Sequence, residues 1–186
     1  GHNTDVTGFM AGFAARGIGL AGKRTVLIGA GGAARAALWG LLRSGVSSVC
    51  IGVRNLAKGK ALCTDFAADG TLAVYCFDDP HFRDVLCTAD IVVQTTPIGM
   101  SPQTDAMPPV DPAAISPSAA VYDLIYTPAE TAFLRAAAAH GCTTINGETM
   151  LVMQGAEAFS LWTGVRPNTD LMQRVLREEL ARREGA

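Results

Sequence analysis

The amino-acid sequence predicts an α/β fold in which a mainly parallel sheet is covered by helices. Short runs of β-branched and other apolar residues alternate with longer segments of helical periodicity, which is typical of parallel strands joined by right-handed crossovers. The strand segments are almost entirely apolar, as expected when both faces of a sheet are buried. The chain has 186 residues, of which 49% are hydrophobic, and this is ample for one compact domain and marginal for two.

Each expected element follows from these patterns. The apolar, β-branched runs predict strands at residues 25–28, 48–53, 72–76, 91–94, 120–124 and 143–145. The segments of helical period predict helices at residues 33–42, 57–68, 81–87, 131–139, 149–162 and 168–183. The Pro-rich stretch 97–117 is expected to form an irregular loop with room for one helical turn.

The charge balance excludes several classes of protein. Lys and Arg number 15 and Asp and Glu number 17, so the net charge is −2, which disfavours binding to nucleic acid or to an anionic membrane. Only 17% of the residues are charged and 20 are Gly, which excludes intrinsic disorder and a coiled coil. No apolar run reaches the length of about 18 residues that a transmembrane helix needs, and no secretory leader is visible at the start.

The cysteines and histidines do not suggest a metal site. The three histidines are far apart in the sequence, the cysteines are odd in number, and no Cys-x-x-Cys motif occurs. We interpret the cysteines as small buried hydrophobic residues in a reducing cytosol rather than as disulfides or zinc ligands, and we expect a cytoplasmic protein without a metal. These residues are Cys50, Cys63, Cys76, Cys87 and Cys142.

A glycine-rich segment connects the first expected strand to the first expected helix. Residues 29–34 read Gly-Ala-Gly-Gly-Ala-Ala and fit the dinucleotide-binding pattern GxGxxA. Gly29 permits a tight turn, Gly31 lets the backbone approach a diphosphate, and Ala34 allows close packing of helix on strand. The helix N-terminus then offers free N–H groups to the phosphates. This context favours a Rossmann-type doubly wound sheet of order 3-2-1-4-5-6 over an ordinary glycine turn.

The residues after the second expected strand indicate which dinucleotide is bound. A site for NAD usually has Asp or Glu about 20 residues beyond the glycines, where it holds the ribose 2′-hydroxyl. No acidic residue occurs between Gly45 and Asp65, and Arg54 and Lys58 lie in that stretch instead. A guanidinium suits a 2′-phosphate, so NADP is favoured over NAD. The alternative is that both cations belong to a solvated surface.

Four further motifs are not explained by a generic dinucleotide-binding fold. They lie at residues 1–8 (Gly-His-Asn-Thr-Asp with Gly8), 96–100 (Thr-Pro-Ile-Gly-Met), 123–131 (Asp-Leu-Ile-Tyr-Thr-Pro with Thr131) and 146–154 (Asn-Gly-Glu-Thr-Met-Leu-Val-Met-Gln). In this order, around the glycine loop, they resemble the shikimate dehydrogenase family over essentially the whole chain. The resemblance is to the family's linker and C-terminal cofactor domain, which an N-terminal substrate domain precedes. It implies that residues 1–20 are a linker and helix leading from that domain. Residues 21–186 are then a dinucleotide-binding domain whose C-terminal helices pack back toward it.

The resemblance implies an enzyme of aromatic amino-acid biosynthesis that reduces 3-dehydroshikimate to shikimate with NADPH. Asp5 matches the family Asp that orients the substrate and assists proton transfer together with a Lys of the N-terminal domain. Tyr126 and Gln154 match positions beside the substrate. The glycine loop and the resemblance together give these expected cofactor-binding residues: Gly29, Ala30, Gly31, Gly32, Ala33, Arg54, Lys58, Thr96, Leu124 and Gly147.

The sequence also departs from the family pattern. Residues 53–55 read Val-Arg-Asn where the family has Asn-Arg-Thr, and residues 94–96 read Gln-Thr-Thr where it often has Asn-Ala-Thr. None of the lysines, at positions 23, 58 and 60, matches the catalytic Lys. Two other functions therefore stay open: a dehydrogenase of quinate or a related polyol, and a non-catalytic module that binds NADPH. The structural alternatives are a helix N-cap for Asp5, a turn residue for Tyr126 and a surface residue for Gln154.

Overall fold

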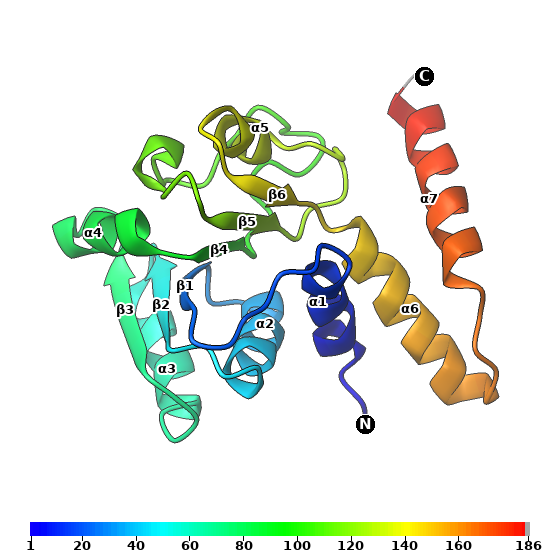
Figure 1. Cartoon of the computed structure of the whole chain (residues 1–186), viewed down its shortest axis with the longest axis horizontal. Coiled ribbons are helices and arrows are strands. Elements are labelled where there is room, and N and C mark those ends of the chain that lie inside the picture. Colours follow the sequence, from blue (N-terminus) through cyan, green and yellow to red (C-terminus); the bar gives the residue numbers. More distant parts are fainter. Residues whose placement is uncertain (185–186) are drawn as a thin grey trace.

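The computed structural model describes residues 1–184, so the last two residues of the predicted dinucleotide-binding domain lie outside the described residues. The described chain forms a six-stranded sheet with helices on both sides (Figure 1). In chain order its elements are α1 (Thr4–Ala14), β1 (Arg24–Ile28), α2 (Gly32–Arg43), β2 (Ser48–Val53), α3 (Leu56–Asp65), β3 (Leu72–Cys76), α4 (Pro80–Thr88), β4 (Ile91–Gln94), the 3₁₀ helix η1 (Pro112–Ala114), β5 (Ala120–Asp123), α5 (Ala132–Ala139), β6 (Thr143–Ile145), α6 (Glu148–Thr163) and α7 (Thr169–Glu184).

The sheet has the strand order β3-β2-β1-β4-β5-β6, and every strand pair in the described residues is parallel. This confirms the predicted order and the doubly wound α/β class. In the centre of the sheet, Leu27 of β1 pairs with Ile51 of β2 on one side and with Val93 of β4 on the other. Strands β2 and β3 are added on one side of β1, and β4, β5 and β6 are added on its other side. Ligands of such folds bind beyond the carboxyl ends of the strands at this reversal of strand order, between β1 and β4.

Both faces of the sheet are buried, as the apolar strands predict. Helices α1, α2 and α3 cover one face, and α4 and α5 cover the other (Figure 1). Leu27 and Leu38 belong to the core on the first face, whereas Val26 and Phe82 belong to the core on the second. Successive side chains of a strand point to opposite faces of the sheet, so the apolar side chains of β1 contribute to both cores.

Helix α1 lies between α2 and α6 and packs closely on both (Figure 1). Two glycines allow α1 to lie close to α6 and to β5 of the sheet. A Cβ atom at Gly8 would overlap the Met150 carbonyl oxygen of α6, and one at Gly12 would overlap the hydroxyl end of the Tyr122 ring. The phenol of Tyr122 stacks on Phe9 at 5.3 Å between ring centroids. The first 20 residues thus include a helix that is part of the core.

Helices α6 and α7 extend beyond the end of the sheet (Figure 1). They are joined by an ion pair in which Arg177 Nε lies 2.8 Å from Oε2 of the buried Glu148. Several large apolar side chains on these helices and their connection are exposed, with Trp162 exposed to 83%. The others are Phe159, Leu161, Val165, Leu171 and Val175.

The cysteines follow the prediction only in part. Cys50 and Cys142 are buried, and burial raises the pKa of the Cys50 thiol to about 12. Cys63 and Cys76 are half-buried. Cys87 is exposed on α4, so its interpretation as a buried hydrophobic residue is wrong. None of the helices described here is long and apolar enough to span a bilayer.

Candidate functional site

The glycine loop follows β1 and leads directly into α2. Gly29 has φ of +110°, a backbone conformation that favours glycine, and its N–H donates to the Gly52 carbonyl at 2.9 Å. Gly31 is the N-cap of α2, and no side chain of the described residues caps this helix. A Cβ atom added at Gly31 or Gly32 would meet nothing within 4 Å. The loop therefore presents helix N–H groups to open space, which is the arrangement that binds a diphosphate.

The residues after β2 lie beside this loop. Asn55 caps α3, because its Oδ1 accepts a hydrogen bond from the Lys58 N–H at 3.2 Å. The side chains of Arg54 and Lys58 are exposed, and neither forms an ion pair with the described residues. Both line a cavity of about 380 Å³ together with Gly29 and Gly31. Two unpaired cations thus border the open N-terminus of α2.

The residues after β4 close the other side of the same cavity, and buried Gln94 fixes their conformation. Its Nε2 donates to the carbonyls of Thr96 at 3.0 Å and Ile98 at 3.1 Å, and its Oε1 accepts from the Thr96 N–H at 2.6 Å. The hydroxyl of Thr95 donates to the Ile28 carbonyl of β1 at 2.7 Å. Thr96 lines the cavity. No role was predicted for Gln94, which differs from the Asn that the family often has at this position.

A second cavity, of about 250 Å³, lies on the other side of the start of α2. It brings together six residues singled out in the sequence: Asp5, Ala33, Leu124, Tyr126, Gly147 and Gln154. The first cavity takes another six: Gly29, Ala30, Gly31, Arg54, Lys58 and Thr96. Gly32 lines neither cavity, although it begins α2. Residues from both halves of the chain therefore form two adjacent hollows around one helix N-terminus.

The close contact of α1 with α6 brings Asp5 to the same cavity as Gln154. Asn3, not Asp5, is the N-cap of α1, and its Oδ1 accepts from the Asp5 N–H at 3.0 Å. This rejects the alternative that Asp5 is the helix cap. Tyr126 is 37% exposed and Gln154 is half-buried, so both side chains are within reach of a ligand in the cavity.

Buried Asp123 holds the turn that carries Leu124 and Tyr126. Its carboxylate accepts hydrogen bonds from the Thr131 hydroxyl at 2.7 Å and from the Ile125 N–H at 3.1 Å. Burial raises its pKa to about 6, although the two hydrogen bonds oppose the shift. Asp123 and Thr131 belong to one of the four sequence motifs, but no role was predicted for either residue. The sequence signal that could have identified Asp123 is its place as a polar residue at the end of an apolar strand.

Gly147 completes this wall of the second cavity. Its N–H donates to the Ile125 carbonyl at 2.9 Å, and a Cβ atom there would collide with the Leu124 carbonyl group. Only glycine therefore lets the start of α6 lie against the turn after β5.

No lysine of the described residues lines the second cavity, and the first cavity has only Lys58, beside Arg54. Lys23 precedes β1 at the opposite edge of the sheet, where its Nζ lies 4.0 Å from Asp90, and Lys60 lies on α3. Across residues 1–184 there is also no group of three metal-binding side chains.

Two family models match the chain. The model of shikimate / quinate 5-dehydrogenase matches residues 13–100, and the model of the shikimate 5′-dehydrogenase C-terminal domain matches residues 147–177. Together the two matches cover more than half of the chain.

Individual relatives agree with these matches. Shikimate dehydrogenase (NADP(+)) of Moorella thermoacetica is 41% identical, with 100% of this chain and 63% of the relative covered. Shikimate 5-dehydrogenase of Thermus thermophilus in complex with NADP(H) and shikimate has a TM-score of 0.80 and 35% identity, covering 98% of this chain and 63% of its own. Quinate dehydrogenase from Corynebacterium glutamicum in complex with NAD has a TM-score of 0.86 and 30% identity, covering 96% and 63%. The chain thus spans less than two thirds of the length of these relatives.

Proposed function

This chain belongs to the shikimate dehydrogenase family, and we propose that it forms the NADP-binding part of an enzyme that reduces 3-dehydroshikimate to shikimate. The main support for the proposal is that two cavities lie next to each other at the N-terminus of α2. One has the features of a phosphate site, and the other is lined by polar side chains from three separate segments.

The first cavity fits NADP in its chemistry. The diphosphate would lie on the N–H groups at the start of α2, where Gly31 and Gly32 leave open space. Arg54 and Lys58 would hold the 2′-phosphate, which NAD lacks. Ala33, Leu124 and Gly147 would border the nicotinamide, because they line the second cavity, in which Ala33 directly follows the glycine residues of the loop. When bound, NADPH would supply the hydride.

The second cavity would take the substrate. The Asp5 carboxylate would accept a hydrogen bond from the reacting hydroxyl and so orient it for proton transfer. Gln154 and Tyr126 would donate hydrogen bonds to other oxygens of the ring. Because these three side chains line one cavity, they would lie together on one side of the substrate.

We further propose that the other wall of the substrate site comes from a separate domain. Residues 1–20 would then be a linker and helix, and residues 21–186 would be the dinucleotide-binding domain. The exposed apolar side chains of α6 and α7, Trp162 above all, support this proposal, because large exposed apolar patches usually mark interaction surfaces. In this account the catalytic lysine belongs to that separate domain and the protein acts in the cytoplasm.

Quinate remains a second candidate substrate. The quinate dehydrogenase of Corynebacterium glutamicum shares this fold at 30% identity, and the matching family model covers both activities. The groups that distinguish the two substrates would lie largely on the proposed second wall.

The experiment is a calorimetric titration of the 186-residue chain with NADPH, beside an absorbance assay with NADP and shikimate or quinate. We expect binding of NADPH and no oxidation of either substrate. Correct positioning alone accounts for about 7–11 kcal/mol of a barrier, and one wall cannot position a small polar ring. Absence of NADPH binding would refute the proposal, and clear turnover would show that the catalytic groups are misassigned.

A further inference from the structure

Gln94 is the last residue of β4, and it is fully buried. It pairs with Ile28 of β1 on one side and with Asp123 of β5 on the other, so it lies where the strand order reverses. Its side-chain amide makes three hydrogen bonds, and all of them go to backbone groups of the next four residues. The amide therefore serves the loop after β4 and does not join this strand to its neighbours.

The amide holds Thr96 at both of its backbone groups. The Thr96 N–H donates to Gln94 Oε1 at 2.6 Å, and the Thr96 carbonyl accepts from Gln94 Nε2 at 3.0 Å. The Ile98 carbonyl accepts from the same Nε2 at 3.1 Å. Both N–H groups of the amide are thereby used, and the backbone of residues 96–98 is fixed against the end of β4.

The side chain of Thr96 is the part of this loop that is left for a ligand. Its Cγ2 lies 2.9 Å from the position that a Cβ added at Gly29 would take, and its Oγ1 accepts from the Ile98 N–H at 3.3 Å. These two contacts fix the direction of the hydroxyl, which donates to no group in residues 1–184. Thr96 is half-buried and lines the first cavity. Its hydroxyl proton is therefore available to an acceptor in that cavity.

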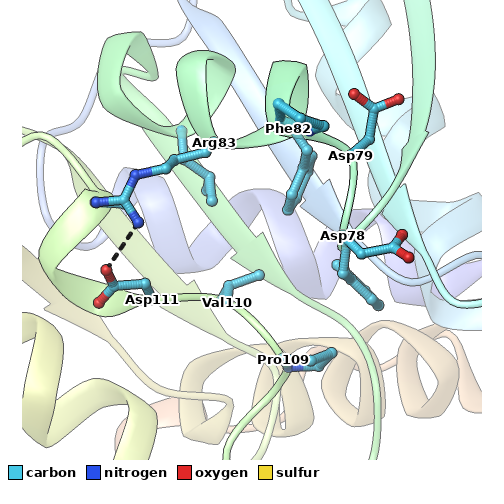
Figure 2. Close-up of a pocket in the computed structure, with 11 residues that line it drawn as sticks. Asp78, Asp79, Phe82, Arg83, Pro109, Val110 and Asp111 are labelled. Atoms are coloured by element: carbon cyan, nitrogen blue, oxygen red, sulfur yellow. Dashed lines mark hydrogen bonds and ion pairs between the residues drawn. The ribbon is translucent and has the colours of Figure 1, made fainter.

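The far end of the loop between β4 and η1 is held independently of Gln94. Figure 2 shows this end, where the Arg83 guanidinium of α4 lies 3.2 Å from the Asp111 carboxylate. Val110 is buried in the same apolar cluster as residues of α4. Loss of the Gln94 amide should therefore loosen residues 95–98 without releasing the rest of the loop.

We propose that Gln94 is a positioning residue for the cofactor, and that it acts by holding the Thr96 hydroxyl as a hydrogen-bond donor to the diphosphate. The inference rests on the proposed function. Because Thr96 lies against Gly29 in the lining of the first cavity, a diphosphate at the N-terminus of α2 would be within reach of this hydroxyl. A donor whose orientation is fixed in advance loses little conformational entropy when the ligand binds. Gln94 thus raises the affinity for NADP without touching it.

The test compares NADPH with adenosine 2′-monophosphate, which carries the 2′-phosphate but no diphosphate. On the 186-residue chain, calorimetry measures NADPH binding, and displacement of NADPH measures binding of the smaller nucleotide. Gln94→Asn leaves an amide that is one methylene too short to reach all three backbone groups, and Thr96→Val removes the hydroxyl. Gln103→Asn is the matched control, because Gln103 is exposed in the same loop and lines neither cavity.

Thr96→Val should weaken NADPH binding about tenfold, the lower end of the range for a hydrogen bond to a charged group. Gln94→Asn should weaken it about three- to tenfold, the range for losing the fixed orientation of one side chain. Both variants should keep the wild-type affinity for adenosine 2′-monophosphate. The double variant should bind NADPH as Thr96→Val does, because Gln94 acts through Thr96. Gln103→Asn should change neither affinity.

Wild-type affinity for NADPH in Thr96→Val would overturn the inference, and this result does not depend on how well the Gln94 variant folds. Wild-type affinity in a folded Gln94→Asn chain would overturn it as well. So would an equal loss of both nucleotides in Gln94→Asn, because the amide would then support the cavity as a whole, and so would additive losses in the double variant. Each of these results would leave the proposed function intact, because the wild type would still bind NADPH. Failure of the wild type to bind NADPH would instead refute the proposed function itself.

Discussion

Substitution of Gly8 by alanine tests the packing that joins Asp5 to Gln154. A Cβ at this position would overlap the Met150 carbonyl oxygen and come within 3.1 Å of the Gln154 backbone nitrogen. Both obstacles are backbone atoms of α6, so they cannot move aside as a flexible side chain could. The added methyl group must therefore displace α1 from α6.

The magnitude follows from two opposing contributions. Alanine in a helix interior is more favourable than glycine by about 1 kcal/mol, whereas overpacking costs about 1–3 kcal/mol. Because the obstacle is backbone, the upper value applies, and Gly8→Ala should destabilise the chain by about 2 kcal/mol. For a chain of this size that lowers Tm by about 4–8 °C.

Gly155→Ala is the matched control, since it places the same methyl group inside α6. Its Cβ would meet only Met172 Cε, at the ordinary contact distance of 3.8 Å. Gly155→Ala should therefore raise Tm by about 2–4 °C, in keeping with the helix propensity of alanine. Calorimetric melting of the three proteins measures the difference. A stabilising effect of Gly8→Ala would refute the rigid contact of α1 with α6.

Two further predictions concern the acidic residues near the second cavity. In a longer protein that carries this segment, Asp5→Asn should lower kcat by about 100-fold or more and leave NADPH affinity unchanged; near wild-type turnover would remove Asp5 from catalysis. Burial raises the pKa of Asp123 from its ordinary value of 3.8 to about 6, so the folded state holds that proton more tightly than the unfolded chain does. Between about pH 4 and pH 7, wild-type stability relative to Asp123→Asn should fall by roughly 2 kcal/mol as pH rises. Urea unfolding of both proteins measures this difference, and a value independent of pH would contradict it.

Much of the fold could be predicted because its signals are local. The apolar runs give the six strands to within about one residue, and the glycine loop identifies the strand and helix that begin the nucleotide-binding unit. The strand order could be predicted from the same glycine loop, because this loop is typical of a doubly wound sheet with the order 3-2-1-4-5-6.

The supporting contacts of the site could not be predicted in the same way. Gln94 and Asp123 act through loops that fold back onto the ends of their own strands, and nothing in the sequence spacing shows which amide or hydroxyl each will meet. The glycine-loop pattern and the resemblance together identified the residues that line the cavities, whereas the three-dimensional structure was needed for those that hold them in place.

The most direct test of the account is the cofactor preference of the 186-residue chain and its dependence on Arg54. Calorimetric titrations should show that NADPH binds more tightly than NADH. Arg54→Ala should weaken NADPH binding by about 1.5–3 kcal/mol, the range for a hydrogen bond to a charged group, with little change for NADH. Lys60→Ala, on the same helix as Lys58 but not in the lining of the cavity, should alter neither affinity. Equal losses for NADPH and NADH in Arg54→Ala would contradict the assignment of this cavity to the 2′-phosphate of NADP.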